Sequence, residues 1–192
     1  NMDQAAETAY SCAHRLLGLA VAYGVEGYLW HCVLALCLAE NENAYSTSCE
    51  IVGEAEGSLN MRVKRDFALI KELFDCDISC LDQICGPDSQ LWKELKNYKA
   101  ANGSSRMFNK RIRDRLVELA VSLEHAETVE EFHRMITDFY KEFGVGTFGL
   151  NKALRVIEKK EKVEIEPIVN IEHIYLNDLV GYELQKKKLI DN

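Results

Sequence analysis

The sequence contains very little proline. Pro87 and Pro167 are the only two prolines in 192 residues, so long stretches of the chain have no residue that would interrupt a helix. Hydrophobic residues make up 47% of the chain and charged residues 28%, which is ordinary for a folded protein with a core. The composition therefore predicts a folded domain in which helices can dominate.

Basic residues are scarce in the first third of the chain. Up to Gly57, Arg15 is the only Lys or Arg, while the same stretch contains eight Asp and Glu. The whole chain has a net charge of -8, which argues against a general nucleic-acid binder, because such proteins are usually basic. We interpret this apolar and slightly acidic third either as a buried hub or as a surface for a partner.

We expect no secretory signal, because no basic residues precede the first apolar stretch at residues 16–25. The seven cysteines are an odd number, which favours reduced thiols in a cytoplasmic protein. Residues 16–39 are long enough to span a membrane, but Glu26 near their centre would be costly in lipid. We therefore expect no membrane segment, and instead two buried helices that meet at a turn over residues 24–27.

The spacing of apolar residues predicts helices along most of the chain. The predicted helices cover residues 5–23, 26–40 and 44–56, a segment from Ser58, a segment from Pro87, a segment ending near Glu124, and residues 129–143. The first two are apolar nearly all round, as expected of helices buried in a core. Ser58 and the serines of a 101–105 loop are predicted N-caps, Pro87 a first helical residue, and Thr128 with Glu131 a capping box.

Three of these helices have an apolar stripe at steps of three or four residues. The stripes are Leu59, Val63, Phe67, Ile70 and Phe74; Phe108, Ile112, Leu116, Leu119 and Leu123; and Phe132, Ile136, Phe139 and Phe143. We expect these side chains to face the core.

The character of the chain changes after Gly144, which is expected to end the last long helix. Residues 159–162 are mostly charged, residues 162–165 alternate between polar and apolar, and Pro167 follows. This pattern indicates an extended segment, with a final short helix over residues 182–190. We therefore predict an all-α, multihelical domain at residues 2–158, followed by an extended linker and lead-in segment at residues 159–192.

Residues 144–149 match the G-x-G-x-x-G pattern of dinucleotide-binding proteins to the letter. That site needs a strand before the glycines, so that backbone N–H groups of the following helix point at the pyrophosphate. Here a helix is predicted before them, and Leu150 and Asn151 stand where a Walker A motif needs Lys and Ser or Thr. We interpret the glycines as a helix stop and a flexible turn, with a docking loop as the alternative.

Cys76, Cys80 and Cys85 are spaced so that the first two would lie one helical turn apart. Together with Cys12 and His14, or with His31 and Cys32, they could be arranged as a zinc site, but the C-x2-C spacing of structural zinc sites is missing. Cysteine is also a common small core residue. We expect buried, inert thiols and no metal site, and keep a thiol-dependent or metal-dependent sensor as a weaker alternative.

Basic residues cluster on one predicted helix, with a smaller group before it. The two groups are Arg106, Lys110, Arg111, Arg113 and Arg115, and Arg62, Lys64 and Arg65. Because Asp114 and Glu118 interrupt the first group, we interpret it as a solvated helix face rather than a nucleic-acid site. None of the five histidines belongs to a recognisable nucleophile or metal motif. We place His125 in a solvated turn and His133 on a helix surface, and predict no catalytic residue.

The last part of the chain carries the most informative pattern. An apolar approach from Ile174 leads to a turn over residues 178–181 (Asp-Leu-Val-Gly), and a helix then opens at residues 182–186 (Tyr-Glu-x-Gln-Lys). This segment resembles the lead-in to the core of an AAA+-type P-loop ATPase. Together with residues 139–153, it is similar to an uncharacterised bacterial ATP-binding family, domain of unknown function 815.

The resemblance implies a variable helical region that precedes an ATP-binding core. It places Val180, Gly181 and Tyr182 on the adenine side of the nucleotide, with ATP and Mg bound by the core of the parent protein. The missing Cβ of Gly181 would let the backbone approach a flat base. The chain contains no G-x4-G-K-[ST] motif, so we expect it to be cut off before the P-loop and to catalyse nothing by itself.

We therefore predict a non-catalytic N-terminal accessory domain of an AAA+-like ATP-binding protein. It would position protein partners or substrates for its own ATPase core, or mediate self-association into a homo-oligomer. The alternative is a free-standing helical protein-interaction scaffold. The surfaces expected to meet a partner or the core are the apolar N-terminal third and residues 144–149.

Overall fold

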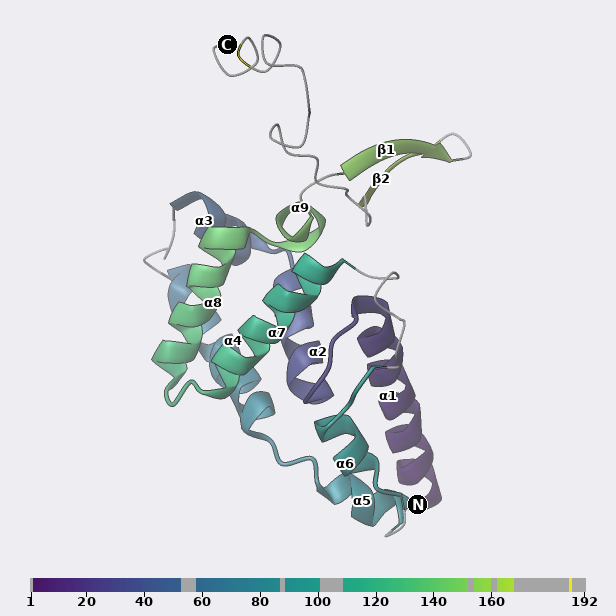
Figure 1. Cartoon of the computed structure of the whole chain (residues 1–192). Helices are drawn as coiled ribbons and strands as arrows, with labels where there is room; N and C mark the ends of the chain where they lie inside the picture. Colours follow the sequence, from purple (N-terminus) through teal and green to yellow (C-terminus); the bar gives the residue numbers. More distant parts are fainter. Residues whose placement is uncertain are drawn as a thin grey trace.

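A computed structural model describes residues 2–52, 58–86, 89–100, 109–151, 154–159, 162–167 and 187 of the chain. Helices make up most of this part, as the sequence predicts, and one small antiparallel sheet follows them (Figure 1). The elements are α1 (Met2–Tyr23), α2 (Leu29–Glu40), α3 (Ala44–Val52), α4 (Ser58–Asp75), α5 (Cys80–Cys85), α6 (Leu91–Lys96), α7 (Lys110–Glu124), α8 (Val129–Phe143), α9 (Gly146–Leu150), β1 (Leu154–Lys159) and β2 (Lys162–Pro167).

Helix α2 is the centre of the fold. It contacts α1 and α6 on one side and α4, α7 and α9 on the other, so it joins two groups of helices (Figure 1). Most of its length is buried, which confirms the predicted hub for this part of the N-terminal third. No helix in the described part of the chain is long and apolar enough to cross a membrane.

The predicted turn between the first two helices is confirmed. Gly24 and Gly27 have φ angles of 66° and 96°, which residues with a Cβ rarely adopt. Gly27 exchanges two backbone hydrogen bonds with Tyr98, and the Glu26 carboxylate accepts a third from the N–H of Ala100. The turn is therefore tied to the segment that follows α6, and Glu26 has a structural partner.

The sequence predicts that helix α1 is buried on all sides, but the structure shows otherwise. It lies at the edge of the molecule and buries a narrow strip of small side chains, among them Ala9, Ala13 and Ala20 (Figure 1). Tyr10 and Val21 are exposed on it. Alanine on the contact side lets α1 approach α2 and α5 closely, but leaves the helix with little surface to bury.

The predicted apolar stripes form the core between α4, α7 and α8. Phe67, Phe74, Ile112, Leu116, Leu119, Leu123, Phe132, Ile136 and Phe139 are all buried. At the centre, Phe132 is fully buried, and its ring meets those of Phe74 and Phe67 edge-on at centroid distances of 5.3 and 6.4 Å. Edge-to-face pairs of this kind are a favoured aromatic geometry.

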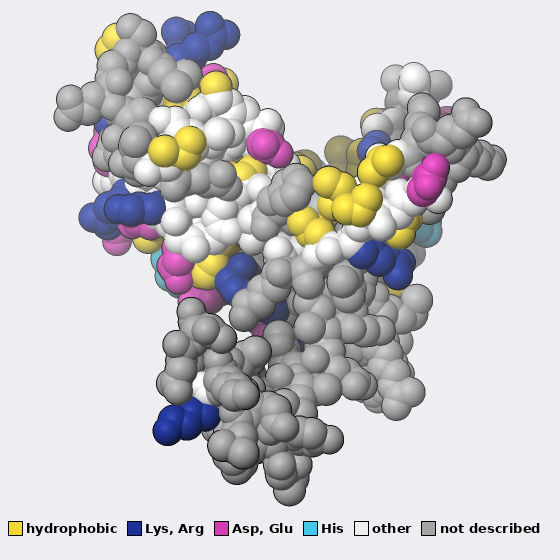
Figure 2. All heavy atoms as spheres, turned by 90° about the horizontal axis from the view of Figure 1, so that it is seen from above, with side chains coloured by type: hydrophobic (Ala, Val, Ile, Leu, Met, Phe, Trp, Pro, Cys, Tyr) yellow, Lys and Arg dark blue, Asp and Glu magenta, His cyan; other side chains and the backbone are white. Residues whose placement is uncertain are grey.

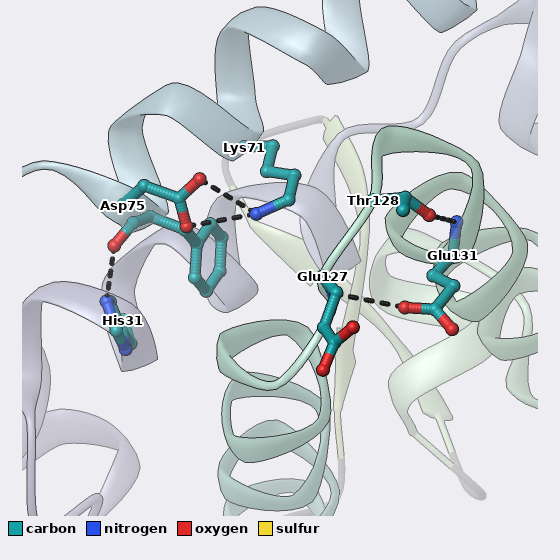
Figure 3. Close-up of polar contacts among 7 residues, drawn as sticks. His31, Lys71, Asp75, Glu127, Thr128 and Glu131 are labelled. Atoms are coloured by element: carbon teal, nitrogen blue, oxygen red, sulfur yellow. Dashed lines mark hydrogen bonds and ion pairs between the residues drawn. The ribbon is translucent and has the colours of Figure 1, made fainter.

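The helix caps agree with the sequence in one case and differ in another. The Thr128 side chain accepts a hydrogen bond from the N–H of Glu131, as predicted, and the Glu131 carboxylate reaches back to the N–H of Glu127 (Figure 3). Helix α7, however, is capped by Asn109, whose side chain accepts from the N–H groups of Arg111 and Ile112. The 101–105 loop that was expected to supply this cap lies outside the described residues.

The helix predicted to begin at Pro87 begins later, at Leu91. Gly86, with φ 102°, ends a short helix, α5, that the apolar pattern does not predict. An Asp82 oxygen from α5 accepts a hydrogen bond from the N–H of Trp92, so α6 starts where α5 offers an acceptor. A single polar contact of this kind leaves no periodic signal in the sequence.

A small sheet follows the last described helix, which ends at Leu150. Residues 154–159 form β1, which pairs with β2 in an antiparallel hairpin above α9 (Figure 1). The predicted extended conformation of residues 162–165 is confirmed, but in a paired strand rather than a linker. The rest of the predicted linker and the short helix at 182–190 fall outside the described residues, except for residue 187.

Candidate functional site

A buried polar cluster lies between α3 and α8. The Tyr45 hydroxyl is 2.6 Å from His133 Nε2 and 3.0 Å from Thr137 Oγ1, and Thr137 Oγ1 donates to the carbonyl of His133 at 2.9 Å. One arrangement of protons satisfies all three contacts: His133 Nε2–H donates to Tyr45, and Tyr45 donates to Thr137. These contacts lock α3 onto α8.

His133 was predicted to lie on a helix surface, but its side chain is 97% buried. The structure therefore corrects that prediction. Its ring packs against Phe67 and Tyr45, at centroid distances of 5.4 and 5.8 Å. The sequence contains a signal for this: His133 follows Phe132 directly and precedes Ile136 by three residues, on the apolar side of α8. With its ring enclosed in this way, His133 stabilises the core.

A second buried histidine, His31, joins three helices. Its Nε2 donates to the carbonyl of Phe74 at 2.8 Å (Figure 3). The centre of its ring lies 4.1 Å from that of Tyr28 and 5.0 Å from that of Phe74. Its Nδ1 faces the Glu124 carboxylate of α7 at 3.6 Å, which is an ion-pair distance but too long for a hydrogen bond. Trp30, beside it on α2, donates to the carbonyl of Leu73 at 2.7 Å. The two side chains thus satisfy carbonyls at the end of α4, which a helix terminus leaves without partners.

The glycine-rich segment does not form the predicted flexible turn. Gly144 ends α8, as expected, with φ 75° and ψ -169°, a conformation open essentially to glycine alone. Residues 146–150 then form the short helix α9. Gly149 packs directly on Gly144: a Cβ on Gly149 would lie 2.3 Å from the Gly144 carbonyl carbon. These glycines therefore allow a close backbone contact, and the element before them is a helix, not the strand of a dinucleotide site.

The cysteines are divided between core and surface. Cys32 and Cys49 are buried, as expected, but Cys12, Cys37, Cys76 and Cys80 are exposed, which corrects the prediction of uniformly buried thiols. Cys76 follows the end of α4 and Cys80 begins α5, so these two do not lie on one helical turn. Within the residues that the structure describes, no group of three or more His, Cys, Asp or Glu could hold a metal ion.

The buried and exposed thiols are expected to differ in reactivity. Burial raises the pKa of Cys32 to about 11, and the nearby Glu124 charge adds to this effect. Because the thiolate is the reactive form, Cys32 should react with iodoacetamide at mildly alkaline pH at least about tenfold more slowly than exposed Cys76. Mass spectrometry of each cysteine peptide over time measures both rates. Equal rates in the folded protein would contradict the burial of Cys32.

Two basic residues of the cluster on α7 have partners within the helix or on its neighbour. Arg113 pairs with Asp114, and the Arg115 guanidinium lies 4.0 Å from the centre of the Phe143 ring on α8. Desolvation and the neighbouring Arg111 charge lower the pKa of Arg115, while Glu142 opposes them. A groove of about 210 Å³ runs between α7 and α8, and its rim includes the acidic residues Glu118, Asp138 and Glu142. These carboxylates make the groove a poor site for phosphates.

The remaining predicted site residues, Val180, Gly181 and Tyr182, lie outside the described residues, so their place beside a nucleotide stays a prediction. On the face shown in Figure 2, hydrophobic side chains are exposed at several places, with Lys, Arg, Asp and Glu scattered between them.

In comparisons with known proteins, no family model matches the chain, and no curated protein or solved structure shows significant similarity to it.

Proposed function

We propose that this chain is a non-catalytic helical module that binds and positions a protein partner, attached to the N-terminal side of an AAA+-like ATP-binding core. The attachment to such a core is supported by the pattern at residues 174–192, which resembles the lead-in to that core. The adenine-side residues 180–182 of this proposal are not among those described. The binding role is supported by the surface of α4.

Helix α4 has apolar side chains on two opposite sides. Phe67 and Phe74 are buried against α8, whereas Met61 and Leu69 are 73% and 57% exposed. At about 100° per residue, Met61, Leu69 and Leu73 fall within an arc of about 120° on the outer side of the helix. A helix that packs on a core needs one apolar side only. The second apolar side is the single observation that carries the binding role, because exposed apolar patches mark interaction surfaces.

The charges around this outer side are of both signs. Arg62, Arg65 and Glu72 are exposed and fall within the same arc as Met61 and Leu69. A partner segment with apolar side chains and charges of both signs would be complementary to it. The same surface would serve a free-standing helical scaffold, so it does not by itself distinguish the two proposals.

The attachment to an ATPase is tested by the coding sequence beyond residue 192 of the parent gene. We expect a hydrophobic strand and a G-x4-G-K-[ST] motif within a few dozen codons, and ATP hydrolysis by the longer protein. A stop codon directly after Asn192 would remove the ATPase proposal and leave the helical scaffold.

The outer side of α4 is tested by replacing Met61 and Leu69 together with glutamate. Because both side chains are exposed, the free energy of unfolding should change by less than about 1 kcal/mol. Self-association of the full-length protein should fall at least about tenfold. Sedimentation velocity measures the self-association, and chemical denaturation measures the free energy of unfolding.

Val121→Glu is the matched control for this pair, because Val121 is also exposed but lies on α7. The control should leave self-association unchanged. If Met61→Glu with Leu69→Glu behaves like the control, α4 is not the binding surface.

A further inference from the structure

Helices α7 and α8 bury their main apolar sides against different parts of the molecule. Helix α7 packs chiefly on α2, whereas α8 packs chiefly on α3 and α4. The two helices nevertheless follow each other directly in the chain and lie side by side (Figure 1). The side chains that they turn toward each other do not fill the space between them, and a groove of about 210 Å³ remains there.

The groove has an apolar floor. Leu119 and Phe139 line it and are only 5% and 6% exposed, and Met135 lines it as a partly exposed side chain. On α7 the lining runs from Arg115 to Ser122, seven residues along the helix or about 10 Å. The groove is therefore long enough for about two turns of a helix to lie along it, as in helix-in-groove recognition.

The rim of the groove is acidic. Glu118 on α7 and Asp138 and Glu142 on α8 are exposed there, and Arg115 is the one basic residue among the described residues that line it. Arg134 is exposed one turn before Asp138 but does not line the groove. Within the described part of the chain, neither Glu118 nor Asp138 takes part in a salt bridge. Two carboxylates at the rim are therefore available to a cation.

Arg115 shows how the groove receives a cation. Its guanidinium lies 4.0 Å from the centre of the Phe143 ring, and the nearby Glu142 charge favours its protonated form. A cation over an aromatic ring is attracted by the electrons of the ring face. Farther along the groove, Glu118 and Asp138 repeat the combination of a carboxylate beside apolar surface.

We propose that the groove between α7 and α8 is a docking site for a basic amphipathic segment of a protein partner. The apolar side chains of the segment pack on Leu119, Met135 and Phe139, and its Lys or Arg side chains reach Glu118 and Asp138. This charge complementarity selects the partner, because the acidic rim repels phosphates and other anions. A second copy of the chain is a poor occupant, since its net charge is -8.

The site goes beyond the outer side of α4 and does not depend on it. None of the described residues that line the groove belongs to α4, and the docking requires no ATPase core. A groove about two helical turns long buries much less than the roughly 800 Å² on each partner of a standard interface. The contact is therefore a weak and transient one, suited to a partner that is held briefly.

The test uses two synthetic helical peptides of about 15 residues, with leucine along one side and either lysine or glutamate elsewhere. Fluorescence anisotropy measures their binding to the full chain at low ionic strength, where charges act most strongly. The lysine peptide should bind with a dissociation constant below about 1 mM, and the glutamate peptide should not bind. Glu118→Gln combined with Asp138→Asn should weaken the lysine peptide at least about fivefold, because two ion pairs are lost.

The matched control is Glu7→Gln combined with Glu72→Gln. It removes the same charge from two exposed helix positions outside the groove, so the affinity should change less than about twofold. Met61→Glu with Leu69→Glu should not weaken the lysine peptide either, because these side chains lie on α4. Failure of the groove and failure of the α4 surface are therefore distinguishable.

Three results would overturn the proposal. The first is no binding of the lysine peptide at about 1 mM. The second is an equal loss of affinity in the groove pair and in the control pair. The third is a loss of affinity in the α4 pair alone. Sedimentation velocity of the free protein tests the competing occupant: a dimer that dissociates in the groove pair alone would assign the groove to a second copy.

Discussion

Replacing Phe132 with alanine is expected to lower the free energy of unfolding by about 3–5 kcal/mol. Phe132 is completely buried, and its ring contacts those of Phe67 and Phe74 on α4. Truncation removes the transfer free energy of the ring and leaves a cavity between α4 and α8, which the surrounding helices can fill only in part. Domains of this size are commonly stable by about 5–15 kcal/mol, so the change would remove a large fraction of the total.

Chemical denaturation followed by circular dichroism measures this effect. The control is Val121→Ala, which truncates an exposed side chain on α7 and should change the free energy of unfolding by less than about 0.5 kcal/mol. A loss below about 1 kcal/mol for Phe132→Ala would mean that the core is not packed around this ring.

Gly149→Ala should lower stability by about 1–3 kcal/mol or more, although alanine is the better helix former. The new Cβ would lie 2.3 Å from the carbonyl carbon and 2.8 Å from the Cα of Gly144. Neither atom belongs to a flexible side chain, so either α9 or the end of α8 must move. Because α9 packs on α2, the shift would reach the centre of the fold.

Gly18→Ala is the control for this substitution, because it makes the same chemical change within a helix with no other atom near the new Cβ. Gly18 lies inside α1, so the alanine should raise stability by about 0.5–1 kcal/mol. The two variants are therefore expected to have opposite signs in the same denaturation experiment. A neutral or stabilising Gly149→Ala would show that α8 and α9 do not meet as closely as described. Amide exchange of α9 and of the α2 residues beside it would locate the change.

The spacing of apolar residues correctly predicted the buried side of each helix that packs one side on the core. The stripe of α8 at Phe132, Ile136 and Phe139 is buried as predicted, and so are Phe67 and Phe74 on α4. The same reasoning was wrong for α1. Its small and apolar residues resemble those of a buried helix, but its place in the fold depends on which neighbours are available to cover it.

At the candidate site, too, a prediction that depends on local sequence order was correct, whereas contacts between distant residues were missed. The helix before Gly144 was sufficient to argue against a dinucleotide site, because that chemistry depends on local order along the chain. The burial of His133 and its contact with Tyr45 were missed, because 88 residues separate the two in sequence. The pairing of β1 with β2 was also missed, since its apolar face is visible only once the register is known.

The sequence by itself determined that the chain is mainly helical, where most of its helices lie, and which side of α4, α7 and α8 faces inward. These properties depend on residues three or four positions apart, whose contact follows from helix geometry alone. Only the tertiary structure decided that α2 is the hub and α1 an edge, that His31 and His133 are buried links between helices, and that Gly149 must have no side chain. Each of these depends on contacts between elements far apart in the chain, and local periodicity contains no information about such contacts.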